Sequence, residues 1–123
     1  MDDDNNKLIK GRKEDIKSYI SFWIGNTIES AGDLDYALKS GRGLTTKYHL
    51  FHSDFWKLFT STYLFISDEE DNIIIKGIQG HLMDYEFNEE ENVSWTLLQD
   101  FHKYLAILKN ADIYDIGIKQ EVF

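Results

Sequence analysis

Apolar residues recur at every third or fourth position in the first quarter of the chain. Over residues 12–31 they include Ile16, Ile20 and Trp23. This spacing places the apolar side chains on one face of an amphipathic helix. The pattern predicts a first helix over these residues, which ends where Gly32 follows the last turn.

Two further helices are predicted before residue 61. Asp33 is suited to the N-cap of a short helix that continues to Ser40, and Gly41 is a typical stop signal. A longer helix is predicted from Thr45 to about Thr60, because large apolar residues again recur at helical spacing. These residues are Tyr48, Phe51, Phe55, Leu58 and Phe59.

The spacing of apolar residues changes after residue 60. Residues 61–67 are rich in β-branched and aromatic side chains, which are typical of a strand, and the acidic run that follows them is typical of a turn. Two more strands are predicted, over Asn72–Gln79 and His81–Phe87, with Gly80 between them. The three strands would form an antiparallel meander.

The last quarter of the chain predicts a long helix and a final strand. Asn92 is a suitable N-cap for a helix that ends near Asn110, and isoleucines within residues 112–122 predict a strand. The expected fold class is therefore α+β, with about three N-terminal helices, a three-stranded antiparallel meander, one long C-terminal helix and a final strand. The alternative is a mostly α protein in which residues 61–66 extend the third helix.

The chain has the size of one domain. We expect a frayed N-terminus over residues 1–10 and a single globular domain over residues 11–123, because the 42% of hydrophobic residues is enough for a core. The absence of cysteine excludes disulfides, thiolate metal sites and cysteine nucleophiles. The acidic start does not resemble a signal peptide, and polar residues interrupt the apolar residues 51–66. We therefore expect a cytoplasmic protein that does not enter a membrane.

The net charge of −9 is concentrated in one segment. Residues 68–91 contain nine acidic residues and a single basic residue, Lys76, so this segment carries −8 of the total. The acidic residues are Asp68, Glu69, Glu70, Asp71, Asp84, Glu86, Glu89, Glu90 and Glu91. Direct binding of nucleic acid is not expected, because it requires clustered lysine and arginine. The charge favours a basic protein as the partner.

The predicted meander would bring the two ends of the acidic segment together. In a three-stranded antiparallel sheet, the turn after the first strand and the exit of the third strand lie at the same end. Residues 68–71 and 89–91 would then be neighbours, while Asp84 and Glu86 would share one face of the third strand. We predict that the nine acidic residues form one partner-binding surface. The alternative is that they only keep two loops solvated or favour the start of a helix.

The sequence contains no strong catalytic or metal-binding motif. His49-x-x-His52-x-Asp54 would place two histidines on one helix face, but neither HExxH nor HxxEH is present. No serine lies in the GxSxG pattern that would pair it with His81 or His102 in a hydrolase. We therefore expect no catalytic residue, no metal, no cofactor and no enzymatic activity.

These features favour a small acidic inhibitor that binds and occludes a basic enzyme, such as one that acts on nucleic acid. The leading form of this hypothesis is an immunity protein for a nuclease toxin. The second form is a phage anti-defence protein that mimics nucleic-acid charge. Two other classes are a small enzyme that combines His49, His52 or His102 with a carboxylate, and an assembly subunit with an apolar patch near Trp56 and Tyr63.

Overall fold

The chain folds into a bundle of helices. The computed structural model describes the backbone of residues 2–84 and 90–111 and the side chains of residues 17–84 and 91–111. The elements are α1 (Asp2–Ser40), α2 (Leu44–Thr62), the short 3-10 helix η1 (Tyr63–Phe65), α3 (Glu69–Met83) and α4 (Glu90–Ala111). Within the described residues there is no strand. The α+β prediction is therefore wrong, and the mostly α alternative describes the fold.

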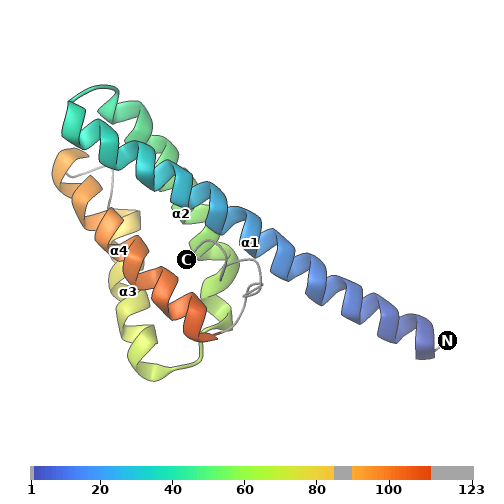
Figure 1. Cartoon of the computed structure of the whole chain (residues 1–123). Coiled ribbons are helices and arrows are strands. Elements are labelled where there is room, and N and C mark those ends of the chain that lie inside the picture. Colours follow the sequence, from blue (N-terminus) through green and yellow to red (C-terminus); the bar gives the residue numbers. More distant parts are fainter. Residues whose placement is uncertain (1, 85–89, 112–123) are drawn as a thin grey trace.

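The first two predicted helices form one continuous helix, α1. Gly32 and Asp33, which were expected to separate them, are exposed residues within this helix. Buried residues continue at helical spacing on both sides of this point, from Ile24 to Leu34, so one face of α1 packs on the bundle throughout. The helix begins at Asp2, within the segment expected to fray, and Figure 1 shows its first half extending beyond the other helices.

A tight turn reverses the chain between α1 and α2. Gly41 and Gly43 have φ angles of 71° and 67°, a left-handed conformation that favours glycine. The backbone N–H of Gly41 donates to the carbonyl of Ala37 at 2.8 Å and completes the last turn of α1. The turn returns α2 along α1, and these two helices form the most extensive helix pair among the described residues.

The prediction of a first strand over residues 61–67 is wrong. α2 continues to Thr62, whose hydroxyl donates to the carbonyl of Leu58 at 2.7 Å. η1 then adds one tighter turn, and the backbone becomes extended at Ile66, which is buried. The β-branched residues of this stretch therefore pack the end of a helix rather than a sheet.

The second and third predicted strands are wrong where the structure describes them, because residues 69–83 form α3. The buried residues of α3 are Ile75, Ile78 and Leu82, which recur at helical spacing. Ile73 and Ile74 are exposed, so the run of isoleucines does not mark a buried strand. Residues 85–87 of the third predicted strand lie outside the described residues. α3 packs mainly against α4.

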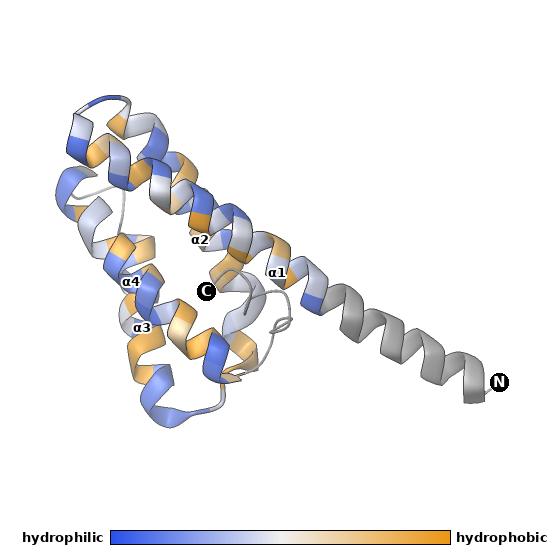
Figure 2. Cartoon of the chain, in the orientation of Figure 1, coloured by the Kyte–Doolittle hydropathy of each residue, from blue (hydrophilic) through white to orange (hydrophobic). Residues whose placement is uncertain are grey.

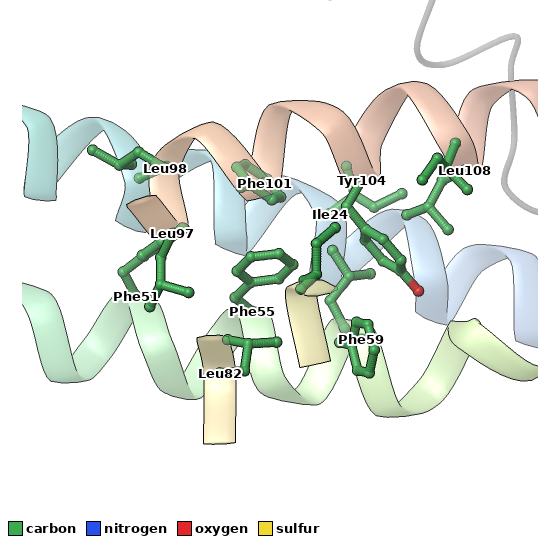
Figure 3. Close-up of a cluster of buried hydrophobic side chains, with 14 of the residues drawn as sticks. Ile24, Phe51, Phe55, Phe59, Leu82, Leu97, Leu98, Phe101, Tyr104 and Leu108 are labelled. Carbon is green, nitrogen blue, oxygen red and sulfur yellow. The ribbon is translucent and has the colours of Figure 1, made fainter. Parts of the chain in front are cut away.

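Aromatic rings of α2 and α4 form the centre of the core. The ring centroids of Phe55 and Phe101 lie 5.4 Å apart with an interplanar angle of 66°, and those of Phe59 and Tyr104 lie 5.3 Å apart. Figure 3 shows these rings together with Ile24 from α1. Such pairs contribute about 0.5–1.5 kcal/mol each beyond their buried area.

Two predicted helices are close to the observed ones. The helix expected from Thr45 to about Thr60 corresponds to α2, and the helix expected from Asn92 to Asn110 corresponds to α4. The final strand predicted over residues 112–122 lies outside the described residues. None of the helices in the described residues is both long enough and apolar enough for a membrane crossing.

Candidate functional site

Four of the nine predicted partner-binding residues begin α3. Asp68 is the N-cap residue, and its Oδ1 accepts from the backbone N–H of Glu70 at 2.9 Å and of Asp71 at 3.0 Å. These bonds pair donors that the first helical turn leaves without a partner, and the negative charge favours the positive end of the helix dipole. Asp68 therefore stabilises the fold, whereas the side chains of Glu69 and Glu70 extend into solvent.

The other predicted partner-binding residues that the structure describes do not lie beside this turn. Asp84 is the C-cap residue of α3, and Glu91 is exposed in the first turn of α4. Glu90 is the first residue of α4, and Glu86 and Glu89 lie outside the described residues. At least Asp84 and Glu91 thus belong to the opposite end of the α3–α4 pair.

Among the described residues, the acidic side chains do not form one continuous surface, because a helix stands where the meander was expected. α3 separates Asp68 from Asp84 by about 24 Å, at about 1.5 Å of rise per residue. Figure 1 shows α4 running antiparallel to α3, so the start of α4 lies near the end of α3. A meander would have folded the acidic segment back on itself, whereas a helix extends it in one direction. The described acidic residues of the segment are therefore divided between two ends of the pair.

Exposed apolar residues lie close in sequence to the acidic first turn of α3. Leu64 and Phe65 of η1 are 78% and 53% exposed, and Ile73 of α3 is 73% exposed. We use the term entry surface for a set of six exposed residues at η1 and the start of α3. They are Leu64, Phe65, Glu69, Glu70, Ile73 and Ile74. Figure 2 shows the hydrophilic first turn of α3 next to its hydrophobic middle. Exposed apolar side chains beside charged ones are typical of a protein-binding surface.

A histidine–aspartate pair joins α3 to α4. The Nδ1 atom of His81 lies 2.7 Å from Oδ2 of Asp100, and Asp100 is buried whereas His81 is half exposed. A carboxylate bonded to Nδ1 fixes the orientation of an imidazole ring, as it does in catalytic dyads. Sequence analysis missed this pair because its members are 19 residues apart on two different helices. His81 lines neither of the cavities described below.

The weak metal-binding pattern of His49, His52 and Asp54 does not form a metal site. His52 is buried and its Nε2 donates to the carbonyl of Leu82 at 2.8 Å. Asp54 instead accepts a hydrogen bond from the hydroxyl of Ser30. Across the described residues, no group of three or more histidine and acidic side chains could hold a metal ion.

Described residues of neighbouring helices line two open cavities. The larger, of about 650 Å³, lies between α1 and α4 and is lined mainly by apolar residues such as Ile28 and Leu105. Asp35 and His102 also line it, but the carboxylate of Asp35 pairs with Lys39 at 2.9 Å. The smaller cavity, of about 510 Å³, is lined by His49, His52, Ser53, Trp56, Leu82 and Met83. The half-exposed histidine–aspartate pair lies outside both cavities, whereas His102 lines the larger cavity and His49 and His52 line the smaller one.

The apolar patch of an assembly subunit was expected near Trp56 and Tyr63. Both residues are partly buried and pack on the core. The ring of Phe59 stacks with Trp56 at a centroid distance of 6.3 Å and with Tyr63 at 5.4 Å. These two aromatic side chains therefore stabilise the bundle, whereas Leu64 and Phe65, which follow Tyr63 in the chain, are exposed.

The entry surface is the strongest candidate site among the described residues. It combines two exposed carboxylates with four exposed apolar side chains in a short stretch of chain that spans η1 and the start of α3. Its function is inferred from its chemistry, because comparison with known protein families, curated proteins and solved structures found no match to this chain.

Proposed function

We propose that this protein is a non-enzymatic cytoplasmic inhibitor that binds a basic enzyme acting on nucleic acid and occludes it. The observation that carries this proposal is the exposure of Leu64 and Ile73 in the same short stretch of chain as the exposed Glu69 and Glu70. Large aliphatic side chains in water contribute nothing to folding, whereas their burial by a partner is favourable. The entry surface therefore has apolar residues that a partner can bury and carboxylates that favour a basic partner.

The two parts of the entry surface have different roles in this proposal. Enzymes that act on nucleic acid carry basic grooves, and a protein with a net charge of −9 is attracted to them. The carboxylates of Glu69 and Glu70 raise the association rate. Burial of Leu64, Phe65 and Ile73 lowers the dissociation rate, which sets most differences in affinity. A bound partner could then no longer admit its nucleic acid.

An immunity protein for a nuclease toxin is the form of inhibitor that we favour. A mimic of nucleic-acid charge needs carboxylates spread along its surface like phosphates, which recur about every 1.7 Å along a duplex. The described carboxylates of residues 68–91 instead gather at two ends of α3, near Asp68 and near Asp84. A surface that joins one acidic end to apolar residues fits the recognition of a protein.

The proposal is tested by recovering the partner and measuring its activity. The tagged protein, used as bait in extracts of its own organism, should retain a basic enzyme whose activity falls when the purified protein is added. Binding should weaken strongly between about 0.05 and 0.5 M salt, because salt screens exposed charges. The double variant Glu69→Gln/Glu70→Gln should slow association, and Leu64→Ser/Ile73→Ser should speed dissociation, each by about tenfold.

The matched control is Glu29→Gln, which removes an exposed carboxylate from α1 instead of from the entry surface. This variant should bind as the unaltered protein does. Asp68 is left intact in all variants because it caps α3. If both double variants bind the enzyme as tightly as the unaltered protein does, the proposed surface is wrong. If the activity of the retained enzyme does not change when the protein is added, the proposed inhibition is wrong.

A further inference from the structure

The solvent face of α3 continues the entry surface along the whole helix. Glu69, Ile73, Gly77, Gly80 and Asp84 follow one another at intervals of three or four residues, and all are exposed. Residues at this spacing lie above one another on a helix. The face therefore carries an acidic residue at each end, an exposed isoleucine after the first and two glycines in between.

The two glycines on this face are not explained by the described part of the chain. Each glycine in a helix interior costs about 1 kcal/mol relative to alanine. Apart from the backbone of α3 itself, a Cβ atom added at Gly77 or at Gly80 would meet nothing within 4 Å, so no described neighbouring element requires a glycine there. The absence of side chains leaves α3 open to close approach by the backbone of another molecule.

The charges on this face determine which kind of molecule can cover it. A second copy in antiparallel orientation would place Glu69 opposite Asp84, and a parallel copy would place Glu69 opposite Glu69. Like charges oppose each other in both arrangements, which disfavours self-association. Lys76, the basic residue of α3, lies to one side of the face. The complementary occupant has basic residues near its ends and apolar residues between them.

We propose that the partner docks a basic amphipathic helix along α3, with its closest approach at Gly77 and Gly80. This inference rests on the proposed function and specifies what the partner contributes. The distance from Glu69 to Asp84 is about 22 Å, which a helix of about 15 residues spans. Apolar ridges of that helix fill the space above the glycines and cover Ile73. Its lysines or arginines lie opposite Glu69, Glu70 and Asp84.

The test uses a synthetic leucine–lysine peptide with an amphipathic helical pattern as the probe. Calorimetry at low salt should show saturable one-to-one binding to the full-length protein. The variants Gly77→Leu and Gly80→Leu should each lower the affinity by about tenfold, because a leucine holds the two helices apart. Both variants favour the helical state of α3, so loss of folding would not account for weaker binding.

The matched control is Gly25→Leu, because Gly25 is also an exposed glycine inside a helix with no atom near its missing Cβ. It should bind the peptide as the unaltered protein does. A peptide with glutamate in place of lysine should not bind. The inference is overturned if the leucine–lysine peptide fails to bind, if the glutamate peptide binds equally well, or if leucine at residues 77 and 80 has no effect.

The two proposals fail in different ways. If Glu69→Gln/Glu70→Gln weakens binding of the recovered enzyme while Gly77→Leu does not, the helical mode of docking is wrong and the proposed function stands. If the enzyme binds equally well after both changes and in high salt, the proposed function itself is wrong.

Discussion

The hydroxyl of Tyr104 is a buried polar group whose proton is fixed by its neighbours. Thr62 uses its own hydroxyl proton to donate to the carbonyl of Leu58, so Tyr104 donates to the oxygen of Thr62. Burial disfavours the charged phenolate and raises the pKa of Tyr104 well above its usual value, although the bond with Thr62 opposes part of this increase. The fold therefore requires a neutral Tyr104.

Tyr104 should make the protein sensitive to alkaline pH. Its folded pKa exceeds its unfolded pKa of about 10, so its contribution to stability is complete below pH 10 and is lost as the pH rises further. The loss from this residue should approach about 1.4 kcal/mol per pH unit. Urea unfolding should be measured at pH 9 and at pH 11. Between these two pH values, the free energy of unfolding should decrease less for Tyr104→Phe than for the unaltered protein. An equal decrease would contradict the assignment.

Single residues also show what the sequence could not reveal about the site. The number and positions of the acidic residues could be read directly from the sequence. The capping role of an acidic residue before a helix follows from local rules. The pairing of His81 with Asp100 could not be predicted, because it depends on how α3 and α4 pack. The exposure of Leu64 and Ile73 was hidden for the same reason, since an apolar side chain is expected to be buried until the neighbouring elements are known.

At the scale of elements, α3 shows why the strand prediction failed. Three consecutive isoleucines between turn-forming residues have the composition of a strand, and short apolar runs do not distinguish strand from helix. The helical signals were the capping residue Asp68 and the spacing of Ile75, Ile78 and Leu82. Packing of these residues on α4 outweighs the local preference for a strand. By contrast, α2 and α4 carry long periodic patterns and were predicted correctly to within a few residues.

Alanine at Gly80 should stabilise the protein. Gly80 lies inside α3 with open space around its missing Cβ, so Gly80→Ala gains helix propensity without a clash. We expect the free energy of unfolding in urea to rise by about 0.5–1 kcal/mol. The opposite result is expected for Gly43→Ala, which should lose about 1–2 kcal/mol because φ is 67° there. An increase of similar size for both variants would contradict the reported backbone conformations.

At the scale of the whole molecule, the sequence defined the composition of the surface but not its arrangement. A single domain with a strongly negative segment was predicted from the residue counts. Whether the two acidic stretches meet depends on the direction of the chain between them, and a helix there places Asp68 and Asp84 at opposite ends. Likewise, the continuity of α1 across Gly32 depends on tertiary packing of one long face, which outweighs the local stop signal.

The peripheral position of α3 has a consequence for the motions of the protein. α1 and α2 pack extensively on each other, whereas α3 packs mainly against one helix, α4. Regions with fewer packed neighbours open at lower free energy than the rest of a protein. Backbone amides of Ile75 and Ile78 should therefore exchange hydrogen for deuterium faster than those of Phe55 and Phe59 at the same pH. A partner that clamps α3 would slow this exchange most, so binding would tighten the least protected helix of the bundle.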